Sequence, residues 1–128
     1  MDFFIKKIQD MQIPNSILLK FSEPNSPPAL VITINHSYKS DCVMFYGHLD
    51  KTPPLTAEWS QGKSPYKLVS EDKKFYGRGI CEGGINLIAT ALMLKKISTE
   101  TKGYLDRYVL LWETDKHSKS KNLVDWFK

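Results

Sequence analysis

An apolar helix pattern lies between two apolar strand patterns, and this order most constrains the fold. The helix pattern spans residues 84–97, and its apolar positions recur at three- and four-residue intervals: Ile85, Ile88, Leu92 and Leu94. Residues 41–46 before it are nearly continuous in apolar residues, as is typical of a strand covered on both faces, and residues 108–112 after it form a second apolar strand pattern. A strand, a crossover helix and a further strand predict an α/β fold, a mixed β-sheet covered by helices.

The remaining segments extend this pattern within one predicted domain. The chain has 128 residues, of which 41% are hydrophobic, an ordinary supply for a single core. We expect a helix at 2–12, strands at 17–21 (as an edge strand) and 29–34, a hairpin at 67–69 and 74–76, and the start of a helix at 123–127. Residues 51–64 lack periodicity and contain prolines, which predicts a long loop with a functional reason for its length.

Composition and charge exclude several classes of function. The formal charge of +4 comes from lysines and arginines spread along the chain, so we expect no nucleic-acid partner, with a small polyanion-binding module as a weaker hypothesis. No apolar run has a transmembrane helix's length, and charges interrupt the N-terminal apolar residues, so we expect no membrane association and a cytoplasmic location. Two cysteines are too few for a disulfide framework and are predicted to be free thiols.

Polar side chains follow two of the predicted strands at the point where each strand ends. His48 and Asp50 come after the strand at 41–46, and residues 113–117 follow the strand at 108–112. Because ligands of such sheets bind outside the carboxyl ends of the strands, the two segments are expected to converge on one site. An imidazole there can bind a metal while a nearby carboxylate orients it. The alternative is a solvated or capping role in a polar turn.

A glycine-rich stretch precedes the predicted helix at 84–97. Glu82 stands where a dinucleotide fingerprint would need glycine, and no Gly-Lys-Ser/Thr follows, so a phosphate loop is excluded. The glycines instead suit a sharp turn that directs Glu82 toward the end of the sheet. The alternative role for Glu82 is a first-turn acid that stabilises the helix. For Cys81 we expect a buried, inert thiol and not a nucleophile paired with His48.

Taken in order, these segments resemble zinc metallopeptidase family twenty, which includes aminoacylases, succinyl-diaminopimelate desuccinylases, carnosine dipeptidases and glutamate-releasing carboxypeptidases. VMFYGHLD is similar to the family's strand ending in Gly-His-x-Asp, and SPYKLVSEDKKFYGRG to its hairpin ending in Gly-Arg-Gly. WETDKHSKS occupies the place of the strand that ends in a glutamate pair. The resemblance covers residues 40–120 and also includes Pro54 and Trp59 in the intervening loop.

The resemblance implies a zinc site with changed ligands. His48 would be a terminal zinc ligand, and Asp50 the carboxylate that supports the site from behind it. Glu82 stands where the family has an aspartate that bridges two zinc ions, and Gly83 and Gly84 follow it in place of an acid and a lysine. The extra methylene of glutamate moves the ligating oxygen by about one bond length, which disturbs a two-metal geometry and leaves one zinc ion at most.

The family's glutamate pair is replaced by Lys116 and His117. Lys116 occupies the place of the general base, and an ammonium that is protonated at neutral pH cannot accept a proton from water. His117 can bind zinc as a neutral imidazole, which makes His48, Glu82 and His117 a sensible ligand set. Because of the neighbouring lysines, a solvated basic turn is the favoured alternative for His117.

The resemblance also implies parts that would lie beyond Lys128: a further acidic ligand, a C-terminal histidine and a lid or dimerisation domain. We therefore expect residues 1–128 to form one partial catalytic domain, descended from an amide-bond hydrolase that acted on N-acyl amino acids or small peptides. Whether it is an enzyme stays uncertain, and catalysis by this chain alone is not expected. The alternative is an interaction protein or split-enzyme subunit, covered by a complementing chain or by self-association.

Overall fold

The computed structural model describes residues 1–35, 41–100 and 107–126 and has the predicted order of elements. The helices are α1 Asp2–Asp10, α2 Gly83–Glu100 and α3 Lys121–Trp126, with 3-10 turns η1 Thr56–Glu58 and η2 Lys116–Ser118. The strands are β1 Ser16–Phe21, β2 Ala29–Ile34, β3 Cys42–His48, β4 Val69–Glu71, β5 Lys74–Tyr76 and β6 Arg107–Glu113. Phe127 of the predicted last helix lies outside the described residues.

The main sheet has four strands in the order β1-β2-β6-β3. β6 pairs antiparallel with β2 and parallel with β3, and β1 pairs antiparallel with β2, so the sheet is mixed, as predicted. β1 is an edge strand, also as predicted. The expectation that residues 41–46 form a strand covered on both faces is wrong, because β3 is the other edge strand and most of its residues are exposed.

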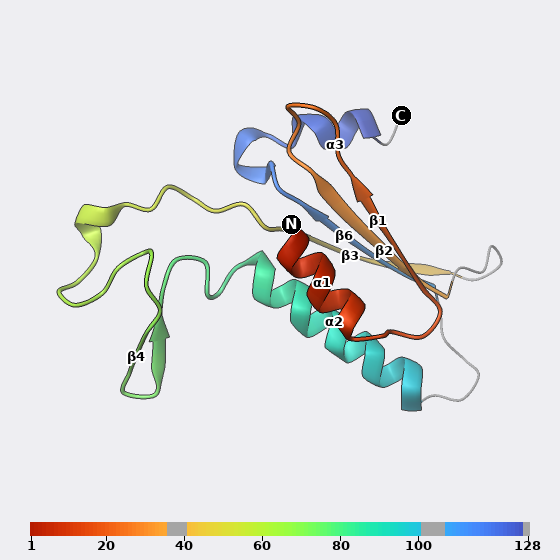
Figure 1. The fold of residues 1–128 in the computed structure, drawn as a ribbon, viewed down its shortest axis with the longest axis horizontal. Coiled ribbons are helices and arrows are strands. Elements are labelled where there is room, and N and C mark those ends of the chain that lie inside the picture. Colours follow the sequence, from red (N-terminus) through yellow and green to blue (C-terminus); the bar gives the residue numbers. More distant parts are fainter. Residues whose placement is uncertain (36–40, 101–106, 127–128) are drawn as a thin grey trace.

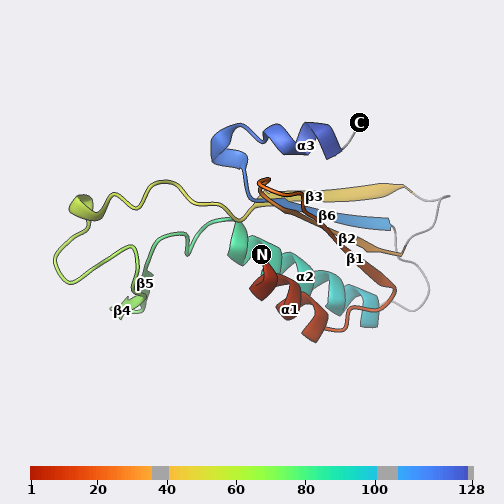
Figure 2. The same ribbon diagram turned by 45° about the horizontal axis from the view of Figure 1, so that its top comes forward.

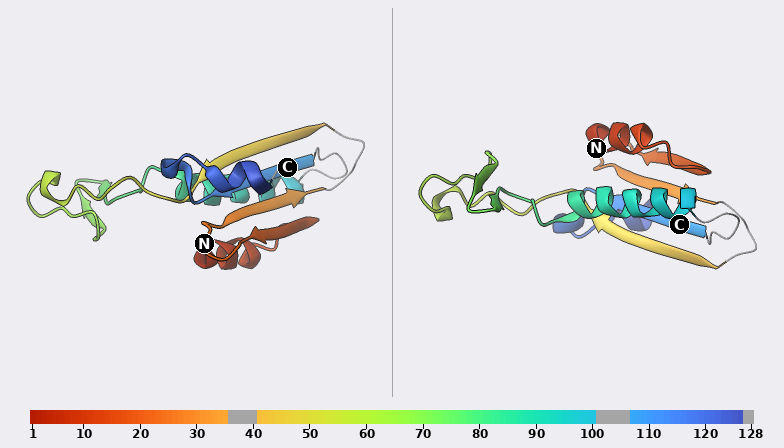
Figure 3. Two further views of the ribbon diagram at one scale, coloured as in Figure 1. Left: turned by 90° about the horizontal axis from the view of Figure 1, so that it is seen from above. Right: turned by 90° about the horizontal axis from the view of Figure 1, so that it is seen from below.

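Helices lie on both faces of the sheet (Figure 2). α1 and α2 pack together on one face and α3 lies on the other, an arrangement also visible from above and below (Figure 3). The buried core lies between the sheet and the pair α1 and α2, and its members include Ile8, Ile32, Leu87, Leu94 and Leu110. Among the described residues, no helix combines the length and the apolar character needed to cross a bilayer.

Residues 51–82 form an arm that projects away from the sheet between β3 and α2 (Figure 1). The predicted long loop is present and contains η1, and the predicted hairpin is the antiparallel pair β4 and β5. The indole of Trp59 donates a hydrogen bond of 2.9 Å to the carbonyl of Pro54 and so closes one turn of the loop. The arm brings the chain back to the end of β3, where α2 begins.

The start of α2 is fixed against the ends of β3 and β6 by close backbone packing. The Trp112 indole donates a 3.0 Å hydrogen bond to the carbonyl of Gly83 and lies against Gly47, where an added Cβ would come within 2.5 Å of the ring. At Gly83 an added Cβ would come within 1.6 Å of the His48 carbonyl oxygen. Glycine is therefore required at both positions, because a side chain at Gly83 would push the helix away from β3 and one at Gly47 would displace the Trp112 indole.

Substitution of Gly83 with alanine should destabilise the protein, since the methyl group meets backbone and not a movable side chain. We expect the free energy of unfolding to fall by about 2 kcal/mol or more, the upper part of the range for overpacked sites. Chemical denaturation followed by Trp fluorescence measures it. Gly77→Ala is the matched control, because the nearest atom to its Cβ would be the Ile80 methyl group at 3.3 Å, and the Leu68 atoms lie at ordinary contact distances. Equal stability of the two variants would contradict this account of the packing.

Candidate metal centre

The ends of β3 and β6 meet side by side and carry the candidate site. His48 is the last residue of β3 and pairs with Glu113, the last residue of β6. The backbone N–H of Leu49 extends this pairing with a 2.8 Å hydrogen bond to the carbonyl of Glu113. His48 and Glu113 were expected just past the strand ends, but both lie within the strands. The convergence of the two segments is as expected.

Three of the predicted site residues come together at this edge. His48, Asp50 and His117 each place one nitrogen or oxygen atom within 4.8 Å of the others. The rings of the two histidines meet edge to face, with their centroids 5.0 Å apart and an angle of 79° between their planes. Asp50 and His117 are 67 residues apart in the chain and still share two hydrogen bonds. We call His48, Asp50 and His117 the metal-site group.

Asp50 holds both imidazoles of this group through their Nδ1 atoms. Its Oδ2 accepts hydrogen bonds from the backbone N–H of His117 at 2.8 Å and from the Nδ1 of that residue at 2.7 Å. The Nδ1 of His48 lies 3.0 Å from the carbonyl oxygen of Asp50 and 3.4 Å from its Oδ1. Because an ionised carboxylate and a carbonyl only accept, both Nδ1 atoms donate, and in the neutral form of each ring the lone pair is on Nε2. A carboxylate behind an imidazole is how metal-binding histidines are commonly oriented.

The surroundings of Asp50 keep its carboxylate ionised. Burial alone would raise the pKa of Asp50, but the hydrogen bonds from the backbone and imidazole of His117 outweigh it and lower the pKa below the ordinary 3.8. The Oδ1 of Asp50 is shielded from solvent and has no hydrogen bond partner. A buried carboxylate oxygen without a partner is costly, and a cation beside it would reduce that cost.

His117 is positioned by the turn η2. The backbone carbonyl of Asp115 accepts hydrogen bonds from the backbone N–H groups of Ser118 and Ser120, and its carboxylate accepts one from the backbone N–H of Lys121. Lys116, at the predicted place of the general base, is exposed. The turn is basic, as the alternative for His117 requires. Its imidazole is nevertheless directed to Asp50 and is 30% exposed.

Glu82 lies apart from the metal-site group although its backbone adjoins it. Gly83, the next residue, packs against the carbonyl of His48. The carboxylate of Glu82, however, lies 3.3 Å from the Nζ of Lys51. It is therefore not one of the three donors that the described structure brings together, and its role as a metal ligand stays a prediction.

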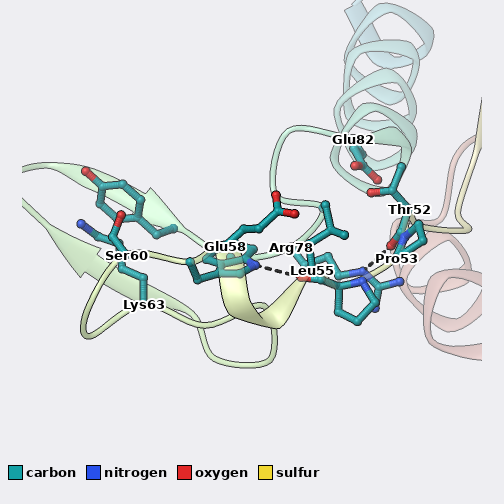
Figure 4. Close-up of a pocket in the computed structure, with 13 residues that line it drawn as sticks. Thr52, Pro53, Leu55, Glu58, Ser60, Lys63, Arg78 and Glu82 are labelled. Carbon is teal, nitrogen blue, oxygen red and sulfur yellow. Dashed lines mark hydrogen bonds between the residues drawn. The ribbon is translucent and has the colours of Figure 1, made fainter.

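A pocket of about 450 Å³ lies in the arm next to Glu82. Figure 4 shows the guanidinium of Arg78 directed toward the loop, where it donates hydrogen bonds to the carbonyls of Thr52 at 2.8 Å and Lys51 at 3.4 Å. Arg78 thus ties the segment that follows Asp50 to the turn before α2. Cys81 in this turn is exposed, so the prediction of a buried thiol is wrong.

The sequence analysis missed a buried carboxylate beside the metal-site group. Glu113 is only 2% exposed, and its Oε1 accepts hydrogen bonds from the hydroxyl of Tyr46 and, at 2.7 Å, from that of Ser120. Burial, followed by the hydrogen bond to Glu113, raises the pKa of Tyr46 to about 12. The alternation of side chains would have placed Tyr46, His48 and Glu113 on one face. The missing information was that these two strands are neighbours and that their register pairs His48 with Glu113.

Comparison with known proteins supports the resemblance inferred from the motifs. No protein-family model matches the chain. Over 83 residues it is 32% identical to the succinyl-diaminopimelate desuccinylase of Rickettsia prowazekii (strain Madrid E), a match that covers 62% of this chain and 21% of that protein. The chain thus spans about a fifth of the length of this curated relative.

Two solved dipeptidases share the fold. Human carnosine dipeptidase 1 superposes with a TM-score of 0.76 and 19% identity, and the dipeptidase Dug1p of Saccharomyces cerevisiae with 0.70 and 18%. Each match covers 98% of this chain and 28% of the other. The mixed sheet with its helices therefore corresponds to part of a known dipeptidase structure, which confirms the predicted fold class.

Replacement of Asp50 with asparagine should loosen the turn that carries His117. We expect the free energy of unfolding at pH 7 to fall by about 1.5–3 kcal/mol, the range for hydrogen bonds to a charged group. Because folding lowers the pKa of Asp50, its contribution is present above the unfolded value and is lost as the pH falls through the folded value. Denaturation from neutral to acidic pH should show the difference between wild type and variant shrink. The control is Asp72→Asn in the exposed hairpin turn, and equal effects of the two substitutions would contradict the assignment.

Proposed function

We propose that the chain belongs to zinc metallopeptidase family twenty and binds one zinc ion through His48 and His117, with Asp50 as the supporting carboxylate. The observation that carries this proposal is that both Nδ1 atoms hydrogen-bond to Asp50. The two Nε2 atoms are then the ring nitrogens available as metal ligands. The match to a protein named as a desuccinylase and to two dipeptidase folds supports the family.

The residues present fit a metal ion of zinc's chemistry. Imidazoles are common zinc ligands, and a carboxylate that accepts a hydrogen bond from the opposite ring nitrogen commonly supports them. When bound, zinc acts as a Lewis acid that polarises a carbonyl group and lowers the pKa of water. The substrate class that fits the relatives' names is an N-acyl amino acid or a small peptide. The protein's own share is to hold and orient the ion.

Amide hydrolysis by this chain is expected to be absent or very slow. Lys116 stands at the place of the family's general base, and a lysine side chain carries its proton at neutral pH and cannot accept another. Glu113 is buried and already bonded to Tyr46 and Ser120. The proposed function is thus metal binding on a hydrolase scaffold, with catalysis dependent on groups that the described residues do not supply.

Zinc titration of the purified chain tests the proposal. We expect one ion to bind with a Kd of about 1 µM or tighter, which corresponds to about −8 kcal/mol. His48→Ala and His117→Ala should each abolish binding in this range, because each removes one of two imidazole donors. Isothermal calorimetry measures affinity and stoichiometry together.

Cys42→Ser and Cys81→Ser are the controls for this titration. Both thiols are exposed and free, and thiolates are strong zinc ligands. Both variants should bind zinc like the wild type. Binding that survives both histidine substitutions, or that disappears with a cysteine, would contradict the assignment of the site.

A second candidate function is an interaction subunit, favoured by apolar side chains that stay exposed. On the arm Tyr66 is 71%, Leu68 63% and Phe75 62% exposed. Exposed apolar surface of this kind is typical of a face that another protein covers. The partner in this second candidate function is another copy of the chain. Sedimentation velocity should then show a dimer that forms with rising concentration and is lost in Phe75→Asp. A monomer throughout would exclude self-association.

A further inference from the structure

Lys51 and Glu82 form a shielded ion pair beside the metal-site group. The Nζ of Lys51 lies 3.3 Å from the Oε2 of Glu82. Both atoms are shielded from solvent, and neither has a hydrogen bond partner. The two side chains are 24% and 32% exposed. Figure 4 shows Glu82 at the end of the pocket next to the helix. Each charge is therefore balanced mainly by the other.

The backbone and a glycine fix Lys51 in this position. The side chain of Lys51 packs against Gly79, where an added Cβ would come within 2.4 Å of its Cε. Gly79 also has a φ of +79°, a conformation that favours glycine, so a larger residue is disfavoured at this position for two reasons. Arg78 donates hydrogen bonds to the carbonyls of Lys51 and Thr52. The chain thus holds the lysine over the turn that carries Glu82, and the contact is part of the packed arm.

The ion pair adjoins the metal-site group on both sides in sequence. Lys51 follows Asp50, and Glu82 precedes Gly83, whose backbone packs on the carbonyl of His48. Despite this proximity, Glu82 is not among the donors that lie within 4.8 Å of one another. An ammonium and a metal dication compete for the same carboxylate, because each is a positive charge that the carboxylate can neutralise.

We propose that Lys51 is an internal counter-cation that holds the Glu82 carboxylate out of the metal site. This inference rests on the proposed metal binding and adds a determinant of its affinity. With Lys51 in place, the two imidazoles are the ligands of the ion and the Asp50 carboxylate supports them. Without the ammonium, the Glu82 carboxylate is released as an additional oxygen ligand. Lys51 is a positioning residue, since it acts on the metal only through Glu82.

A double-mutant cycle separates this role from a simple charge effect. The four proteins are the wild type, Lys51→Met, Glu82→Gln and the double variant, titrated with Zn²⁺ in competition with a chelator. We expect Lys51→Met to tighten zinc binding by about tenfold or more, a change that such titrations resolve readily. Glu82→Gln alone should change the affinity little, and the double variant should return to the wild-type value.

Absorption spectra with Co²⁺ provide a second measurement, and they would stay unchanged if Lys51 had only a structural role. In Lys51→Met the visible bands of bound Co²⁺ should differ from those of the wild type, since a carboxylate joins the ligands, and should revert in the double variant. Lys63→Met is the matched control. It removes the other loop lysine that pairs with a glutamate, at 2.9 Å from Glu71, and should leave both affinity and spectrum unchanged. Lys51→Gln provides a second variant should Lys51→Met fail to fold.

The cycle also distinguishes failure of this inference from failure of the proposed function. If Lys51→Met and Glu82→Gln changed the zinc affinity by equal and opposite amounts and left the Co²⁺ spectrum unchanged, the effect would come from net charge alone. That result would overturn the inference. A large loss in Glu82→Gln would overturn it too, because Glu82 would already be a ligand. A wild type that binds no zinc, beside a Lys51→Met variant that binds it through Glu82, would refute the proposed function and support the inference. No binding by any of the four would refute both.

Discussion

The contact between the first turn of α2 and the end of β3 is the constraint on which the site depends. Gly83 lets the helix backbone contact the carbonyl of His48, and the indole of Trp112 donates a hydrogen bond to the carbonyl of Gly83. Three segments distant in sequence are thereby joined where β3 and β6 end. This contact between Gly83 and His48 also sets the positions of Glu82, which precedes the helix, and of Asp50, which follows the strand. A larger residue at position 83 would separate the two halves of the site.

Electrostatics then divides the carboxylates of this edge among different partners. The carboxylate of Asp50 bonds to His117, that of Glu113 to the hydroxyls of Tyr46 and Ser120, and that of Glu82 pairs with the ammonium of Lys51. Only Asp50 belongs to the metal-site group. Among the described residues, the candidate metal centre therefore includes only one of these three acids, because the other two are engaged elsewhere.

The sequence predicted the elements well, since periodicity and turn residues are local signals. The helix expected at 84–97 and the hairpin before it are both present. The order of the strands was harder to predict. The apolar residues Val43, Met44 and Tyr46 suggested a strand covered on both faces, but β3 lies at an edge of the sheet. The convergence of His48 and Asp50 with His117 followed from the rule for strand ends. The pairing of Lys51 with Glu82 could not be foreseen, because a loop of irregular conformation brings them together.

The central claim is that Asp50 orients two imidazoles whose Nε2 atoms bind one metal ion. Two-bond ¹H–¹⁵N correlation spectra of the histidines, recorded with and without Zn²⁺, test it most directly, because they report the protonation and coordination of each ring nitrogen. The account predicts that the Nδ1 atoms of His48 and His117 stay protonated while the Nε2 resonances of both shift as one equivalent of zinc is added. Coordination through Nδ1, or ring resonances that zinc leaves unchanged, would contradict it.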